Sequence, residues 1–147
     1  MKTNLPLTSA QEICQNIHQA FSIHLSELFE VTSDNFEEII KNAGRNGDKF
    51  TMSCLPGLLC LAILKNDEIR QHRIRSMIEF LDVDFFEEEP NSWIDLKQRN
   101  MSMFSLLNEK ERNAVIKWLE FIKSLDLDND FDSEEVESAL RYWHSIA

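Results

Sequence analysis

The sequence predicts an all-α fold, in which a single domain over residues 1–147 forms a bundle of five to seven helices around a buried apolar central helix. Apolar residues recur at helical spacing along most of the chain. Three glycines and three prolines are few for a β-rich protein, which needs many tight turns. With ten Phe and three Trp among 147 residues, the chain can bury a core without disulfides or metal.

The N-terminal part of the chain predicts a long amphipathic helix. Thr8 and Ser9 can cap it, and apolar residues then fall on one stripe over 9–29. Residues 1–8 precede the stripe, so we expect them to form a loose N-terminal arm.

Two sequence patterns have the spacing of a capping box, in which two side chains satisfy the free N–H groups of a helix start. Asp34 with Glu37 predicts a short helix over 34–43. Asn108 with Glu111 predicts a longer helix, because Ala114, Val115, Trp118, Phe121, Ile122 and Leu125 follow at core spacing.

The most apolar stretch, FTMSCLPGLLCLAILK, predicts the central helix. Ser53 can cap it, and Pro56 fits its first turn, where the missing N–H costs nothing. From Leu55 to Leu64 the chain is apolar on all sides, which is typical of a helix in the middle of a bundle. Gly57 would allow another segment to approach closely.

The remaining helices each show one apolar face. Asp67 can cap a helix that runs to about Leu81, Asn91 can begin a short helix to about Arg99, and Ser133–His144 forms the last helix. Their apolar faces consist of Ile74, Met77, Ile78 and Leu81, then Trp93 and Leu96, then Val136, Ala139, Leu140 and Trp143.

Negative charge is concentrated in the second half of the chain. Residues 1–75 carry 8 basic and 9 acidic side chains, a net of −1, whereas residues 76–147 carry 7 and 17, a net of −10, which together give the formal net charge of −11. Direct binding to nucleic acid through a basic face is therefore not expected. A cationic protein is the natural partner, because charge of one sign steers and orients an oppositely charged surface.

The stretch LDLDNDFDSEEVE has three interpretations. Asp126, Asp128, Asp130 and Glu137 occupy positions one, three, five and twelve of a calcium-binding EF-hand loop. Phe131 stands where that loop needs glycine, a serine stands where it needs an apolar residue, and no second hand follows. We therefore predict no specific metal site.

The other two interpretations are helix capping and docking. Asp132 or Ser133 can cap the last helix, and the helix dipole favours Glu134 and Glu135 in its first turn. Capping does not account for the three aspartates that precede Asp132, so we expect them to form a binding surface. The alternative is a solvated loop without a functional role. The candidate partner contacts here are Asp126, Asp128, Asp130 and Glu134.

A second acidic cluster is DVDFFEEE, residues 82–89. Phe85 and Phe86 are candidate aromatic anchors inside an acidic rim that consists of Glu87, Glu88 and Glu89. The alternative is that both phenylalanines pack into the core.

Catalysis finds little support in the sequence. There is no glycine-rich phosphate loop and no H-E-x-x-H motif. Cys14 and His18 are four residues apart, which permits a nucleophile pair, but packing against the core is the simpler interpretation. With Cys54 and Cys60, Cys14 is expected to be a buried, reduced thiol. We predict no enzyme activity, no cofactor and no metal.

The location of the protein is predicted from what the chain lacks. No run near about 18 apolar residues is present, so we expect no membrane-spanning segment. The N-terminal MKTNLPLTSAQEI lacks the apolar region of a signal peptide, which together with the sparse cysteines indicates a cytoplasmic protein.

Four motifs occur in a familiar order: IHQAF, FTMSCLPGLLCLAIL, FSLLNEKERNAVIKWLEFIKSL and SALRYW. Over roughly residues 13–143 this succession resembles a family of small, acidic, all-α bacterial proteins thought to include immunity proteins of polymorphic toxin systems. The resemblance implies a non-catalytic protein that binds and blocks a cognate toxin. The alternatives are an acidic inhibitor or nucleic-acid mimic directed at another basic protein, and an adaptor module.

Overall fold

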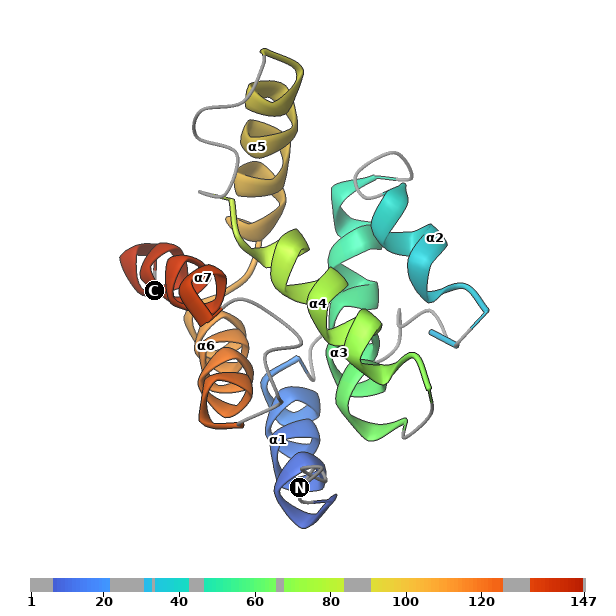
Figure 1. Ribbon diagram of the computed structural model, residues 1–147. Helices are drawn as coiled ribbons and strands as arrows, with labels where there is room; N and C mark the ends of the chain where they lie inside the picture. Colours follow the sequence, from blue (N-terminus) through green and yellow to red (C-terminus); the bar gives the residue numbers. More distant parts are fainter. Residues whose placement is uncertain are drawn as a thin grey trace.

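The computed structural model describes residues 7–21, 31–32, 34–42, 47–65, 68–83, 91–125 and 133–146, without the side chains of 7, 8, 91–97 and 133. Within these ranges the chain forms seven helices and no strand, which confirms the all-α prediction (Figure 1). The helices are α1 Leu7–Ala20, α2 Phe36–Lys41, α3 Asp48–Leu64, α4 Arg70–Leu81, α5 Asn91–Phe104, α6 Glu109–Ser124 and α7 Ser133–Ile146. None of them is long and apolar enough to cross a membrane.

Helix α3 is the central element, as predicted. It packs against α1, α2, α4 and α5, and side chains on all of its faces are buried. Gly57 lies where another segment comes close: a Cβ added to it would be 2.8 Å from Cγ2 of Val31. The expected close approach is therefore present, and it involves the side chain of Val31.

Helices α6 and α7 pack together beside α1 (Figure 1). Trp118 of α6 is fully buried, and its Nε1 donates to the Leu59 carbonyl oxygen of α3 at 2.9 Å. A buried indole N–H needs such a partner, so this bond fixes α6 against the central helix.

The C-terminal end of α4 is bound to α7 by two hydrogen bonds. Trp143 Nε1 donates to the Leu81 carbonyl oxygen at 3.0 Å, and Ser138 Oγ donates to Asp82 Oδ1 at 2.8 Å. Phe104 at the end of α5 packs on Trp143, with ring centroids 4.8 Å apart. These contacts gather the ends of α4 and α5 around α7, while the start of α5 points away from the other helices in Figure 1.

Helices α1 and α3 begin earlier than predicted. Helix α1 begins at Leu7, so Thr8 and Ser9 lie inside it rather than before it. Helix α3 begins at Asp48, after Gly47 with φ of +101°, so Pro56 lies in its interior and not in its first turn. Ser53 is also interior, and its hydroxyl donates to the Phe50 carbonyl oxygen at 2.6 Å, a bond within the helix that competes with capping.

Of the two predicted capping boxes, one is confirmed and one is wrong. Asn108 Oδ1 accepts from the Glu111 N–H at 2.9 Å, and Glu111 Oε1 accepts from the Asn108 N–H at 2.8 Å. At α2 the residue before the helix is Asn35 instead of Asp34, and it makes no side-chain cap bond. The Asn35 Oδ1 accepts from the Thr32 N–H at 2.8 Å, so the turn before α2 uses the amide that would otherwise cap.

Other boundaries shift by a few residues. Helix α5 is longer than predicted and continues to Phe104, because Met103 and Phe104 bury fully against the core. Helix α7 continues to Ile146. The predicted first helix ends at Ala20 among the described residues, and its expected extension over 22–29 lies outside them. Asp67 does not cap α4, because that helix begins at Arg70 with Ile69 as the residue before it. The predicted apolar face of α4 is confirmed, since Ile74, Met77, Ile78 and Leu81 are all 0% exposed.

Candidate functional site

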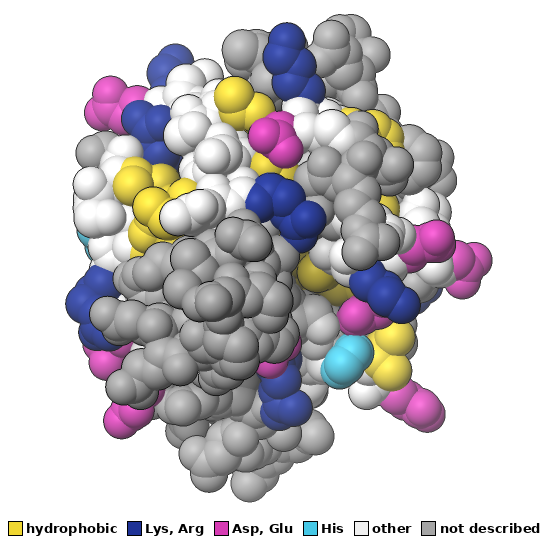
Figure 2. Space-filling model, turned by 90° about the horizontal axis from the view of Figure 1, so that it is seen from above, with side chains coloured by type: hydrophobic (Ala, Val, Ile, Leu, Met, Phe, Trp, Pro, Cys, Tyr) yellow, Lys and Arg dark blue, Asp and Glu magenta, His cyan; other side chains and the backbone are white. Residues whose placement is uncertain are grey.

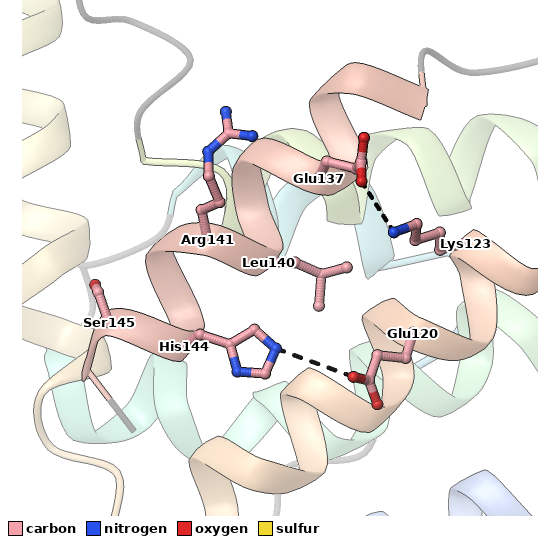
Figure 3. Close-up of a pocket in the computed structure, with 7 residues that line it drawn as sticks. All are labelled: Glu120, Lys123, Glu137, Leu140, Arg141, His144 and Ser145. Carbon is pink, nitrogen blue, oxygen red and sulfur yellow. Dashed lines mark hydrogen bonds and ion pairs between the residues drawn. The ribbon is translucent and has the colours of Figure 1, made fainter.

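A surface groove runs between α6 and α7, with a volume of about 760 Å³ (Figure 3). On α7 the lining side chains are spaced three and four residues apart, which places them on one face of the helix. The described lining residues are Glu120 and Lys123 of α6, and Glu137, Leu140, Arg141, His144 and Ser145 of α7.

Charges of opposite sign alternate along this groove. Lys123 Nζ lies 2.9 Å from Glu137 Oε1, and His144 Nε2 lies 3.9 Å from Glu120 Oε2, so each helix provides one carboxylate and one cation or imidazole (Figure 3). The hydrogen bond from Lys123 lowers the pKa of Glu137. About half of each side chain is exposed, so these pairs contribute little to stability.

The groove combines paired charged side chains with an apolar floor. The hydroxyl of Ser145 donates to the Tyr142 carbonyl oxygen of its own helix at 2.5 Å. Leu140 lies between the charged pairs and gives the groove an apolar floor (Figure 3). Paired charges around an apolar patch suit contact with a protein surface, because such a rim orients a partner without a reacting group.

A smaller hollow of about 320 Å³ lies between α1 and α6. Lys110 and Lys117 line it together with the amides of Asn16, Gln19 and Asn113. The hollow is therefore locally basic, although the chain as a whole is acidic.

Cys60 of α3 lies near the part of α1 that carries Cys14 and His18. Cys60 Sγ lies 3.8 Å from His18 Nε2, and the two thiols interact, since hydrogen bonding with Cys60 lowers the pKa of Cys14. The interaction with Cys14 and burial raise the pKa of Cys60. Burial likewise raises the pKa of Cys54 to about 11. All three cysteines are free and buried, as predicted.

Metal binding has no support from the part of the chain that the structure describes. No group of three or more His, Cys, Asp and Glu side chains there is arranged to hold a metal ion. Glu137, which would be the twelfth-position ligand of the EF-hand pattern, is paired with Lys123 instead.

Of the predicted partner contacts, Glu134 is described. It is exposed in the first turn of α7, and the partly buried Glu135 lies in the same turn, as the helix-dipole argument predicted. The others lie outside the described residues, namely Phe85, Phe86, Glu87, Glu88, Glu89, Asp126, Asp128 and Asp130.

The acidic cluster over 82–89 does not start at the surface. Asp82 is 1% exposed and Val83 is 2% exposed, so both belong to the core. Because Asp82 accepts from Ser138, the end of α4 lies against the early turns of α7. No sequence pattern predicts the hydrogen bond between Ser138 and Asp82, because a single serine on a helix does not indicate its partner.

No known protein family, curated protein or solved structure matches this chain. The resemblance to immunity proteins therefore stays a prediction. What the protein does is inferred below from the charge and geometry of its own residues.

Proposed function

We propose that the protein is a non-catalytic inhibitor: a cytoplasmic immunity protein that neutralises a cognate bacterial toxin by covering its active or substrate-binding site with an acidic surface. The observation that carries the proposal is the net charge of −10 in residues 76–147, against −1 in residues 1–75. Charge of one sign on one part of a molecule accelerates and orients docking to a cationic partner.

Some carboxylates in residues 76–147 are buried in the fold and cannot contact a partner. Glu111 is 1% exposed and closes the capping box of α6, while Asp82 is buried against Ser138. The partner-facing charge must therefore come from the remaining carboxylates. Those described as exposed in this half are Glu79, Glu109, Glu120, Glu134 and Glu137.

The two acidic clusters are attached to neighbouring points of the molecule, which supports a single docking surface. Val83 is the last described residue of the 82–89 cluster, and Ser133 is the first described residue after 126–132 in the other stretch. Ser133 is five residues from Ser138, or roughly 7.5 Å along α7 at 1.5 Å per residue, and Ser138 is bonded to Asp82.

A nucleic-acid mimic is less favoured, because it would need a regular array of carboxylates. The groove between α6 and α7 alternates Glu120 and Glu137 with His144 and Lys123. On the face seen in Figure 2, Lys and Arg side chains likewise lie among Asp, Glu and apolar side chains wherever the surface is coloured. A mixed surface of this kind fits a protein partner that is matched residue by residue.

The proposal is tested by identifying the partner and measuring its activity. Tagged protein would be used to capture partners from the native organism, and mass spectrometry would name them. We expect a cationic protein whose toxic activity falls to background when the purified inhibitor is added in equal amount, and whose expression stops growth unless the inhibitor is co-expressed. A partner that keeps full activity at saturating inhibitor would refute inhibition and favour the adaptor alternative.

A further inference from the structure

Two of the three cysteines, Cys14 and Cys60, lie on helices α1 and α3, which pack together. His18 follows Cys14 by one helical turn, and its Nε2 is 3.8 Å from Cys60 Sγ. The fold thus brings Cys60 close to Cys14 and His18, although it lies more than forty residues further along the chain.

The two thiols of this cluster are not equivalent. Hydrogen bonding with the Cys60 thiol lowers the pKa of Cys14, whereas the pKa of Cys60 is raised by that same interaction and by burial. The Cys14 sulfur therefore ionises first, and a thiolate is the form that reacts with oxidants. Cys60 keeps its proton, and the His18 imidazole lies 3.8 Å from its sulfur, where it can accept that proton.

Cys54 provides an internal comparison on the same helix. It is six residues from Cys60, which places it about 120° around α3 at 3.6 residues per turn. Its side chain is 0% exposed, whereas Cys14 and Cys60 are 4% and 6% exposed, so the pair is slightly more accessible to a small oxidant than Cys54 is.

We propose that Cys14 and Cys60 form a peroxide-sensitive modification site, which closes into an intramolecular disulfide between α1 and α3. In the first step the Cys14 thiolate attacks hydrogen peroxide: an S–O bond forms, the O–O bond breaks, and hydroxide leaves and takes up a proton as water. In the second step Cys60 passes its proton to His18 Nε2 and attacks Cys14 Sγ. The S–O bond breaks, and the departing hydroxide takes the proton from His18. Two thiols and one peroxide thus give one disulfide and two molecules of water.

The disulfide would connect two helices that are already packed together. A crosslink between Cys14 and Cys60 closes a long loop, which restricts the unfolded chain more than the folded one. Oxidation is therefore expected to stabilise the protein. This inference does not depend on the proposed inhibitor function, and its test uses no partner.

The test is native oxidation followed by mass measurement. Folded protein is treated with hydrogen peroxide, free thiols are blocked with N-ethylmaleimide after denaturation, and the intact mass is read. We expect a loss of 2 Da with one blocked thiol, reversal by dithiothreitol, and a melting temperature that is higher by roughly 5–15 °C in the oxidised form.

Cysteine variants assign the bond. Trypsin cleaves after Lys49 and Lys65 and so leaves Cys54 and Cys60 in one peptide, which makes variants necessary. Cys54→Ala should still lose 2 Da, whereas Cys14→Ala and Cys60→Ala should not. His18→Ala should slow closure, so that a sulfenic acid at Cys14 can be trapped by dimedone.

Three results would overturn the inference. The first is wild-type protein that keeps three blockable thiols after native oxidation. The second is a bond that is lost in Cys54→Ala, and the third is a bond that joins two copies of the chain on a non-reducing gel. Closure at the wild-type rate in His18→Ala would refute the role assigned to the imidazole.

Discussion

Replacement of Trp118 tests the packing of α6 on the central helix. The side chain is 0% exposed and its Nε1 donates to the Leu59 carbonyl oxygen at 2.9 Å. A buried Trp removes roughly 150–250 Å² from water, and at about 25 cal/mol per Å² this is worth several kcal/mol. Trp118→Ala should therefore lower the free energy of unfolding by about 3–5 kcal/mol, as large aromatic truncations in cores do.

The hydrogen bond can be separated from the packing. Trp118→Phe keeps an aromatic ring but removes the N–H donor, whose net contribution is about 0.5–1.5 kcal/mol. We expect Trp118→Phe to lower the free energy of unfolding by about 1–2 kcal/mol, because it loses both the hydrogen bond and the contacts of the larger ring. This loss is well below that of the alanine variant. Lys117→Ala is the matched control, because Lys117 is the exposed neighbour on the same helix and should change stability by less than about 0.5 kcal/mol.

Urea unfolding followed by circular dichroism at 222 nm measures these differences. The dependence of the free energy on urea should stay the same among the variants, which shows that they lose stability and not cooperativity. A loss below about 0.5 kcal/mol in Trp118→Ala would show that the side chain is not buried in solution, and the assigned face of α6 would be wrong.

Three further predictions concern a cap, a close contact and a metal. Asn108→Ala removes the confirmed capping box and should cost about 0.5–2 kcal/mol in the same urea assay; an unchanged midpoint would contradict the cap. Gly57→Ala places a Cβ 2.8 Å from Val31 Cγ2 and should cost about 1–3 kcal/mol, whereas a stabilised variant would show that this contact relaxes freely. Excess calcium should leave the melting temperature unchanged, because a specific site at 100 times its dissociation constant would add about 2.7 kcal/mol; a clear rise would restore the EF-hand interpretation of the acidic stretch.

Much of the fold could be predicted because helical periodicity reports burial directly. The apolar face of α4 and the buried Trp118 and Trp143 follow from residues three and four apart. The capping box at Asn108 was also predictable, because its two side chains interact with backbone groups three residues away and need no tertiary partner.

Helix starts were predicted less well, because tertiary packing outweighs local preference. The sequence favours a start at Ser53, where a hydroxyl and a following proline suit a first turn. The structure starts α3 at Asp48, which adds Thr51 and Met52 to the buried surface. Burial of these two side chains favours the longer helix, although Pro56 in its interior has no N–H to donate.

The cluster around Cys14 shows what one sequence can and cannot indicate. The spacing of Cys14 and His18 marks a shared face of α1. Cys60 could not be assigned to that face, because α3 is apolar all round and its periodicity does not say which side meets which neighbour. The sequence likewise does not indicate the hydrogen bond between Asp82 and Ser138, because these residues are 56 positions apart.

The most direct test of the central claim is the association rate of a triple Asn variant. Asp126, Asp128 and Asp130 are all changed to Asn, and binding to the captured partner is followed at low and high salt. The matched control changes Glu12, Glu38 and Glu68 to Gln, three exposed carboxylates in the half that carries a net of −1, so that net charge rises equally.

If the acidic stretch is a docking surface, the triple Asn variant should fold normally and associate at least about threefold more slowly at low salt, while the control changes less. The difference from wild type should shrink as salt rises, because exposed charges are screened beyond about 8–10 Å. Association at the wild-type rate in low salt, or an equal slowing in the Gln control, would contradict the account.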